Sequence, residues 1–185
     1  MTDVSHTQIT DQTRVWLETA VIGLNLCPFA KAVYNKGLVR FEVSTSRHLD
    51  DFLEKLDSEL LLLRDTPATE LETTLLIEPT LFADFEVFND VLDITDQVLV
   101  EHGLDGIVQI APFHPDFQFA DAAENGISNY TNRSPYPTFH LIREDSIAKA
   151  MQAFPDAESI FERNIALLEE MGIEGWQALW QPKAS

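Results

Sequence analysis

The sequence has little of several residue types, and each shortage excludes a class of protein. It contains one cysteine among 185 residues, so no disulfide can form within the chain, which is typical of a reducing compartment. Seven glycines and no Gly/Ser-rich run leave no flexible linker. No apolar run reaches the roughly 20 residues that a membrane-spanning helix needs. We expect a single domain over residues 1–185, with residues 1–8 as a loose amino-terminal tail.

Basic residues are also scarce. The chain has 12 lysine and arginine residues against 31 aspartate and glutamate residues, which gives a formal net charge of −19. This charge repels phosphate backbones and anionic lipid headgroups, so we expect neither a nucleic-acid partner nor a membrane partner. It favours solubility in a crowded cytoplasm, and a basic protein partner is the alternative. The polar segment 1–13 lacks the apolar part of a secretory signal, so we expect a cytoplasmic protein.

Signatures of several common chemistries are missing as well. The chain has no glycine-rich phosphate loop, no dinucleotide fingerprint, no serine triad order and no cysteine–histidine cluster with zinc-finger spacing. Nucleotide hydrolysis and serine catalysis are therefore disfavoured, and we predict no cofactor.

Hydrophobic periodicity predicts alternating helices and strands. Apolar residues at three- and four-residue spacing predict helices at 11–26, 28–35, 49–63, 84–102, 146–154 and 156–171. Period-two alternation and short apolar runs predict strands at 38–43, 73–77, 107–111 and 139–142. This order predicts an α+β (α/β-type) fold with a mixed four-stranded sheet packed by helices. The helices are expected on one face of the sheet, as a two-layer sandwich, or alternatively on both faces.

The connection between the third and fourth strands is unlike a solvated linker. Residues 111–138 read APFHPDFQFADAAENGISNYTNRSPYPT, which is rich in aromatic residues and prolines. Prolines fix the backbone, and a stiff loop holds side chains as accurately as a site requires. Long connections are uncommon in compact domains and are often functional. We expect the 112–140 segment to be a structured loop that builds a site.

This segment supplies most of the candidate site residues. His114 and Asp116 are candidate catalytic residues, because a histidine oriented by a carboxylate can move a proton near neutral pH. The candidate substrate-binding residues are Arg133, Asn132 and Tyr136. An arginine fork matches a carboxylate or phosphate group, so the expected ligand is a small anionic molecule. Alternatively, Arg133 pairs with Asp116 or Glu124 and only fastens the loop.

His114, Asp116 and His140 have the residue types of a two-histidine, one-carboxylate metal triad. Known oxygenases with that triad are barrels of many strands, and this helix-rich chain does not resemble one. We therefore predict no metal and keep the triad as an alternative. Alternation with Phe139 and Leu141 would instead place His140 on a solvated face of the sheet.

The lone cysteine, Cys27, is a further candidate catalytic residue. It precedes Pro28, which is expected to open a helix, where free N–H groups and the helix dipole lower a thiol pKa. Position 30 is alanine, so the resolving thiol of a Cys-Pro-x-Cys redox site is absent. The alternative is a small buried apolar residue at a helix kink.

Three motifs together carry a resemblance to a known family. The segments NLCPFA at 25–30, HPDFQFA at 114–120 and NRSPYPT at 132–138 resemble an uncharacterised family, domain of unknown function 1415. The likeness covers nearly the whole chain and implies a bacterial, single-domain protein. It implies no activity and assigns no catalytic residue.

Three functional hypotheses follow. The first is an enzyme acting on a small anionic metabolite, held by Arg133 and Asn132, with His114 moving a proton and Cys27 as nucleophile or pocket wall. The second is a non-catalytic binding or regulatory domain that docks a partner through the aromatic residues of the loop. Exposed aromatic residues would mark such an interface, and buried ones a core. The third is a metal-dependent enzyme, and each hypothesis is compatible with a homo-oligomer.

Overall fold

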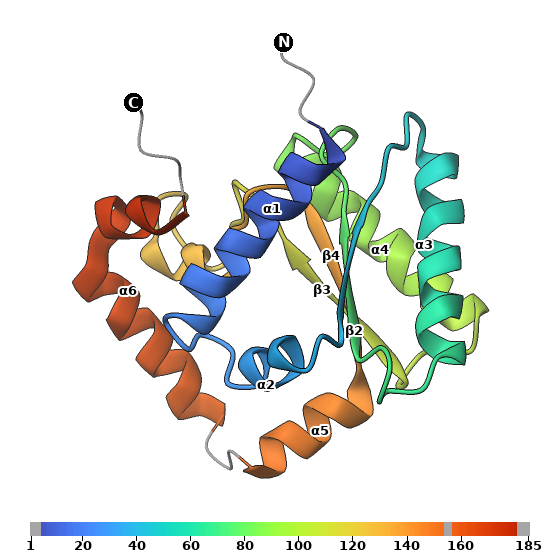
Figure 1. Cartoon of the computed structure of the whole chain (residues 1–185). Helices are drawn as coiled ribbons and strands as arrows, with labels where there is room; N and C mark the ends of the chain where they lie inside the picture. Colours follow the sequence, from blue (N-terminus) through green and yellow to red (C-terminus); the bar gives the residue numbers. More distant parts are fainter. Residues whose placement is uncertain (1–4, 154–156, 181–185) are drawn as a thin grey trace.

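The computed structural model describes residues 5–153 and 157–180, and its centre is one mixed sheet (Figure 1). The strands are β1 (Val39–Val43), β2 (Thr73–Ile77), β3 (Val108–Phe113) and β4 (Thr138–Arg143). Their order is β1-β2-β4-β3, with β1 parallel to β2 and β4 antiparallel to both β2 and β3. The four-stranded mixed sheet expected from the sequence is confirmed. Strands β1, β2 and β3 therefore end at the same edge of the sheet, which we call the carboxyl edge.

The helices also follow the expected order. They are α1 (His6–Trp16) continued by the π-helix η1 (Leu17–Ile22), α2 (Ala30–Asn35), α3 (Leu49–Asp65), α4 (Phe85–Glu101), the 3-10 helix η2 (Ile127–Asn132), α5 (Glu144–Ala153) and α6 (Ala157–Trp180). Gly172 has a φ of 69°, which bends α6 where the sequence predicts a helix end. None of the helices within 5–153 and 157–180 is long and apolar enough to cross a membrane.

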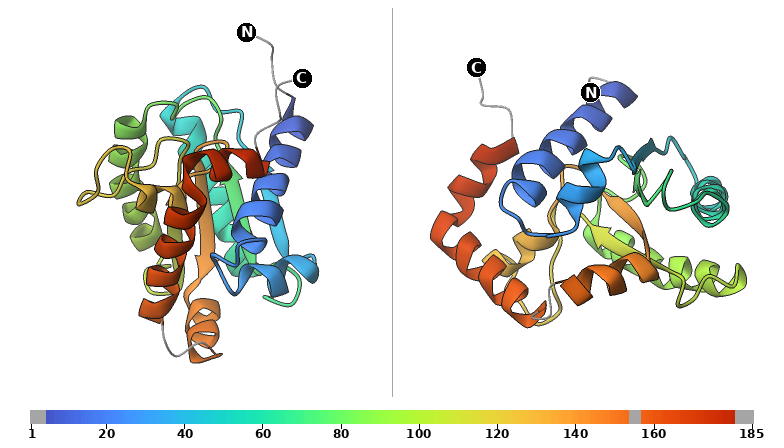
Figure 2. Two further views of the ribbon diagram at one scale, coloured as in Figure 1. Left: turned by 90° about the vertical axis from the view of Figure 1, so that its left-hand side faces the viewer. Right: turned by 60° about the horizontal axis from the view of Figure 1, so that its bottom comes forward.

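Helices cover both faces of the sheet, so the two-layer expectation is wrong and its alternative is correct. Helices α3 and α4 pack on one face around a core that includes Phe52, Leu76 and Phe139. Helices α1 and α6 pack on the other face around Trp16 and Trp176. Figure 2 shows the sheet between these two helical layers. Strand β2 is buried along its whole length, because it lies inside the sheet with helices on both faces.

The amino terminus is more ordered than the sequence suggested. Residues 1–4 of the expected tail lie outside the described residues, but α1 already begins at His6. Ser5 and Gln8 form a capping box, in which each side chain accepts a hydrogen bond from the other residue's backbone N–H. This exchange satisfies donors that a helix start leaves free, and it stabilises a start five residues before the expected one.

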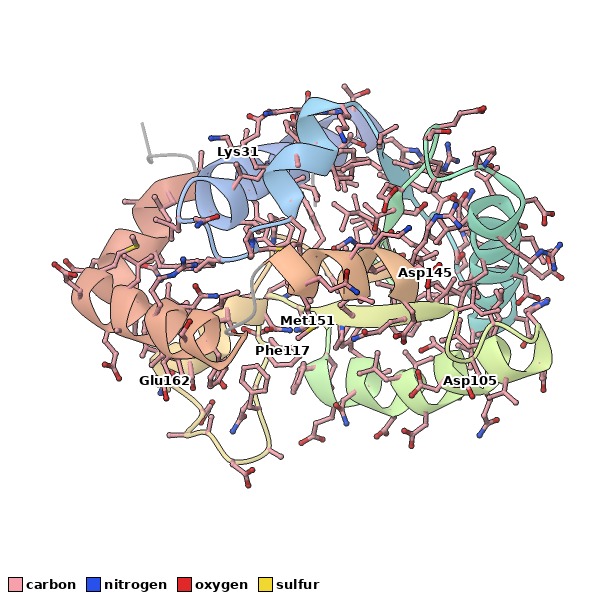
Figure 3. All side chains as sticks on the ribbon, turned by 90° about the horizontal axis from the view of Figure 1, so that it is seen from below. Lys31, Asp105, Phe117, Asp145, Met151 and Glu162 are labelled. Carbon is pink, nitrogen blue, oxygen red and sulfur yellow. The ribbon has the colours of Figure 1, made fainter. Side chains whose placement is uncertain are left out.

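Side chains fill the space on both sides of the sheet (Figure 3). Phe139 of β4 is fully buried, and its ring centroid lies 4.8 Å from that of Phe52 and 4.9 Å from that of Phe88. Phe117 of the long loop lies beside α4, with its ring 5.4 Å from that of Phe85 (Figure 3). The long connection, residues 114–137, is thus a structured loop that packs against the core, as expected.

The aromatic cluster around Phe139 yields a stability prediction. Phe139→Ala removes a fully buried ring and leaves a cavity, so it should lower the free energy of unfolding by about 3–5 kcal/mol. Phe161→Ala removes a ring that is 51% exposed and should change that free energy by less than about 0.5 kcal/mol. Urea unfolding of both variants measures the difference, and equal effects would contradict this description of the core.

Candidate functional site

Three connections leave the sheet at its carboxyl edge. Residues 44–48 follow β1, residues 78–84 follow β2, and residues 114–137 follow β3 (Figure 1). The first two lead directly into the amino termini of α3 and α4. Open α/β sheets bind their ligands outside the carboxyl ends of parallel strands. A ligand site is therefore expected at this edge.

A polar cavity of about 410 Å³ lies at the carboxyl end of β1. Hydroxyl and charged side chains dominate its wall, which consists of His6, Glu42, Val43, Ser44, Thr45, Ser46, Asp51 and Lys55. We call it the carboxyl-edge cavity. It has the polar lining that orients a small polar ligand, although drug-type pockets are usually more apolar.

The serines after β1 are held in a fixed arrangement. Ser44 is 1% exposed, and its Oγ lies 2.7 Å from Ser46 Oγ. The Ser44 N–H donates to the Ile77 carbonyl oxygen at 2.8 Å, which extends the β1–β2 ladder by one bond. The hydroxyl pair is thus anchored to the sheet and is positioned before any ligand arrives.

A buried carboxylate follows the neighbouring strand. Glu78 is fully buried directly after β2, and its Oε1 accepts hydrogen bonds from the N–H groups of Thr80 and Leu81. The Thr80 hydroxyl lies 2.6 Å from the same oxygen and 3.2 Å from the Ser46 carbonyl oxygen. Glu78 Oε2 has no hydrogen-bond partner among the described residues. A buried polar atom of this kind requires an explanation, because an unmet hydrogen bond in the interior is unfavourable.

Two charged residues of the cavity wall, Glu42 and Lys55, belong to a network of four charged side chains. Lys55 Nζ lies 2.5 Å from Glu42 Oε1 and 3.4 Å from Glu59 Oε1, and Arg40 contacts the same two carboxylates. Burial lowers the pKa of Lys55, but the hydrogen bonds and charges of Glu42 and Glu59 outweigh it and leave that pKa raised. Lys55 therefore stays protonated near neutral pH and is unsuited to act as a general base.

His114 connects the long loop to the connection after β2. Its Nε2 lies 2.8 Å from the Phe82 carbonyl oxygen, and its Nδ1 accepts a hydrogen bond from the Asp116 N–H at 3.0 Å. A carbonyl only accepts, so Nε2 carries the proton and the ring is neutral. His114 is fully buried between Phe85 and Phe88, and burial lowers its pKa. Both ring nitrogens are occupied by the backbone, which leaves neither available for proton transfer or a metal.

The partners expected for His114 and Arg133 differ from those in the structure. Asp116 is exposed, and it orients His114 through its backbone N–H and not through its carboxylate. Arg133 donates to the carbonyl oxygens of Phe117 and Glu124 and lies 4.1 Å over the Tyr130 ring. It forms no ion pair with a carboxylate among the described residues. Arg133 therefore fastens the loop, which was the alternative to ligand binding. It does so through backbone carbonyl groups and an aromatic ring, and not through the expected ion pair.

The other two candidate binding residues also fasten the loop. Asn132 Nδ2 donates to the Pro112 carbonyl oxygen at 3.1 Å, and its own carbonyl accepts from the His114 N–H. The Tyr136 hydroxyl donates to Gln12 Oε1 of α1, and burial raises its pKa. The aromatic residues Phe117 and Tyr130 are buried, so they form core and do not support a docking surface.

His140 lies opposite Leu75, on the sheet face that α1 and α6 cover, and is half-buried, so the expectation of a solvated face is wrong. The Thr73 hydroxyl donates to the Leu141 carbonyl oxygen, so it accepts from His140 Nε2 at 2.7 Å. Burial lowers the pKa of His140 to about 4, so the ring is neutral at pH 7. No group of three histidine, cysteine or carboxylate side chains within the described part of the chain could hold a metal, so the triad of His114, Asp116 and His140 is not assembled.

Cys27 lies far from the carboxyl edge. It belongs to the segment between η1 and α2, and α2 leads into the amino end of β1 (Figure 1). Burial raises the pKa of Cys27, and hydrogen bonds from Phe29 and Ala30 lower it by less. The expectation of a lowered thiol pKa is therefore wrong. Helix α2 starts at Ala30, so Cys27 precedes the helix and packs beside the α1–α6 core as a partly buried apolar residue.

The family comparison agrees with the resemblance seen in the motifs. A model of the family described as Protein of unknown function (DUF1415) matches residues 8–178. The chain belongs to this family. No curated protein and no solved structure matches it. The family description names no activity and assigns no role to any residue of this DUF1415 chain.

Sequence reasoning missed Ser44, Ser46 and Glu78 at the carboxyl edge and Asn129 in the long loop of this DUF1415 chain. The run Ser-Thr-Ser at 44–46 has the composition of a helix cap, but polar residues directly after a parallel strand also indicate a ligand site. Glu78 was visible as an acidic residue after the apolar strand β2. Asn129 is fully buried and bonds the backbone of Phe119, Ala123 and Glu124, which sequence spacing does not reveal.

The pKa of His140 predicts a pH dependence of stability. The ring is neutral when folded and has an ordinary pKa of about 6.5 when unfolded, so acid favours the unfolded chain by about 1.4 kcal/mol per pH unit between about 6.5 and 4. His140→Gln cannot titrate and keeps a donor for Thr73. Between pH 7 and 5 the variant should lose about 1–2 kcal/mol less free energy of unfolding than the wild type. Urea unfolding tests this, with exposed His48→Gln as the control; equal losses in all three proteins would contradict it.

The environment of Cys27 predicts slow alkylation. Because burial raises the thiol pKa, reaction with iodoacetamide should reach half its maximal rate above the ordinary pKa of about 8.5. The same measurement in urea gives the reference for the unfolded chain. A midpoint below about 8 in the folded protein would restore Cys27 as a candidate nucleophile.

Proposed function

We propose that this DUF1415 protein binds a small polar molecule bearing hydroxyl or amino groups in the carboxyl-edge cavity. The observation that carries the proposal is the position of a polar cavity at the carboxyl end of β1, beside its parallel neighbour β2. The prearranged Ser44–Ser46 hydroxyl pair lines the wall, and the incompletely bonded Glu78 follows the adjacent strand.

The lining favours a ligand that donates hydrogen bonds. Glu42 and Asp51 are acceptors, and the hydroxyl groups of Ser44, Thr45 and Ser46 can accept as well. Lys55 is the ammonium group of the wall, but two carboxylates already neutralise it. The overall charge of −19 further attracts cations and repels anions. These features support a polyhydroxylated or amino-bearing molecule over the small anionic metabolite expected from the sequence.

The contacts of the candidate catalytic residues support ligand binding without catalysis. Two groups with catalytic chemistry are engaged, His114 by two backbone partners and Lys55 by two carboxylates, whereas His6 of the cavity wall is exposed. Cys27 has a raised pKa and lies towards the amino end of β1. We therefore favour the non-catalytic binding domain over the enzyme, with the ligand at the carboxyl edge instead of a partner on the aromatic loop. The lone cysteine and the acidic composition support a cytoplasmic location.

A ligand screen on the whole chain tests this function. We expect a polyol, amino sugar or amino alcohol at about 100 times its Kd to raise the unfolding free energy by about 2.7 kcal/mol, which corresponds to a Tm rise of about 5–10 °C. Carboxylates and phosphates tested in the same panel should give no shift. Thermal unfolding and titration calorimetry provide the two measurements.

Two variants assign any binding to the cavity. Ser46→Phe places a ring in the cavity and should abolish the Tm shift, whereas Ser58→Ala, at an exposed serine of the same helix as Lys55, should leave it unchanged. A shift that survives Ser46→Phe, or a panel in which only anions bind, would refute the proposed site and ligand class.

A further inference from the structure

Strand β1 has an open outer edge. It pairs with β2 on one side, and no other described strand pairs with it. The Leu38 carbonyl and the Ser44 N–H both bond to the β2 side. Because backbone groups alternate along a strand, Val39, Phe41 and Val43 direct their N–H and C=O groups outward. An unpaired row of this kind is a template for another strand.

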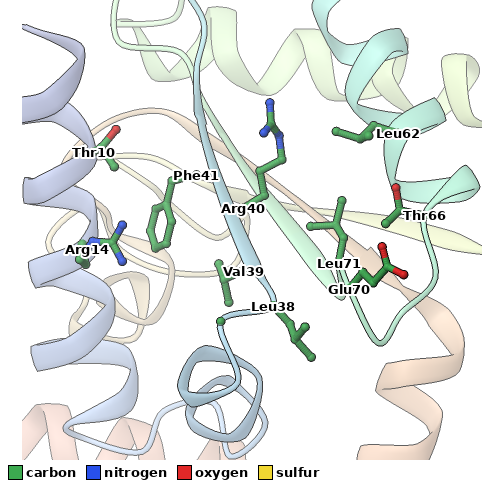
Figure 4. A pocket seen from close by; sticks show the side chains of 11 residues that line it. Thr10, Arg14, Leu38, Val39, Arg40, Phe41, Leu62, Thr66, Glu70 and Leu71 are labelled. Atoms are coloured by element: carbon green, nitrogen blue, oxygen red, sulfur yellow. The ribbon is translucent and has the colours of Figure 1, made fainter.

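A groove exposes this edge. A cavity of about 480 Å³ runs along β1 between α1 and α3, and Figure 4 looks into it with β1 in the middle. Arg14 of α1 contacts Phe41 of β1, but Trp16 two residues later contacts Phe113 of β3, so α1 lies across the sheet. Helix α3 packs over β2. The edge of β1 is therefore left between the two helices.

The opposite edge of the sheet is protected. Strand β3 contains Pro112, which has no N–H to offer, and its carbonyl accepts a hydrogen bond from Asn132. The His114 N–H donates to the Asn132 carbonyl, which continues the cover. Strand β1 has none of these devices: it has no proline and no loop bonded along its outer side within the described residues.

The sequence of β1 is complementary to itself when it runs antiparallel. It reads Val-Arg-Phe-Glu-Val from 39 to 43, so reversal about Phe41 exchanges the two valines and exchanges the arginine with the glutamate. In that register Arg40 lies opposite Glu42 of a second copy, twice by symmetry. A shift by two residues in either direction places Arg40 opposite Arg40, or Glu42 opposite Glu42. Opposite charges across a strand pair stabilise it and like charges destabilise it.

The direction of the backbone N–H and C=O groups of β1 agrees with the same register. The outward residues 39, 41 and 43 then form the pairs that exchange two backbone bonds each, with Phe41 facing Phe41 on the axis. Arg40 and Glu42 take the closer, non-hydrogen-bonded positions, and their side chains are 37% and 23% exposed. Local charge is favourable as well, because Arg40 and Lys55 balance Glu42 and Glu59 at this edge of an acidic protein.

We infer that two copies of this chain form a two-fold symmetric dimer by antiparallel pairing of their β1 strands, centred on Phe41. The dimer has one continuous sheet through both copies, the same patch of each copy forming the interface. Arg40 of the second copy then lies beside Glu42, which is part of the carboxyl-edge cavity wall, so each copy borders the ligand site of the other. This assembly goes beyond the proposed ligand binding and does not depend on it.

Sedimentation velocity of the full chain between about 1 μM and 1 mM tests the dimer. The wild type should reach twice the monomer mass. Arg40→Glu and Glu42→Arg each place like charges opposite one another at both symmetry-related positions, so each alone should weaken the dimer at least tenfold. A mixture of the two variants restores opposite charges at both positions and should form a heterodimer about as tightly as the wild type. Arg64→Glu, at an exposed arginine of α3 outside the groove, makes the same charge change and should leave the dimer intact.

Val43→Pro supplies a second test if Arg40→Glu does not fold, because Arg40 also pairs with buried Glu59. Proline at 43 removes an outward N–H and spares the bonds to β2, so it should abolish the dimer while circular dichroism stays unchanged. A wild type that remains monomeric over the whole range would overturn the inference. So would a dimer that Val43→Pro leaves at wild-type strength, or a failure of the mixed charge variants to associate.

Discussion

A buried, neutral histidine is the constraint on which the carboxyl edge depends. The Phe82 carbonyl requires a donor and the Asp116 N–H requires an acceptor, and one tautomer of His114 satisfies both. The bond to Phe82 joins the connections that follow β2 and β3, although β4 separates those strands, and the bond from Asp116 fixes the ring. The Glu78 N–H adds a bond to the Pro137 carbonyl, which ties in the chain that enters β4. Hydrogen bonds between the segments after β2, after β3 and before β4 therefore fix the edge that carries the polar cavity.

The residues with the most reactive chemistry thus serve as a frame, and ordinary hydroxyl and carboxylate groups form the cavity. Arg133 donates its hydrogen bonds to backbone carbonyl groups of the loop, and Asn132 donates to the carbonyl group of Pro112 in β3. A loop of this length has many backbone groups that no strand or helix satisfies, and once it is buried they require side-chain partners. Polar residues chosen for that purpose resemble a catalytic set in the sequence, because both uses need histidine, asparagine and arginine.

The sequence predicted regular structure better than the site. All four strands were located within two residues, since alternation and short apolar runs follow directly from burial on one or two faces. The start of α1 was missed because its signal is the Ser5–Gln8 exchange and not hydrophobic periodicity. The uses of His114 and Cys27 depend on which groups the fold brings against them, such as Phe82, thirty-two residues before His114. Periodicity contains no information about such partners.

The position of β4 has a consequence for how the chain becomes folded. It is the last strand in sequence but lies inside the sheet, between β2 and β3. Until residues 138–143 emerge from the ribosome, β2 and β3 have no partner on their facing sides, and two of the three ladders of the sheet cannot form. A nascent or truncated chain that ends before β4 therefore exposes two apolar strand edges at once, which favours association with other unfinished chains. Completion of the fold depends on long-range pairing, so we expect folding to be slow relative to that of a helical bundle of the same length.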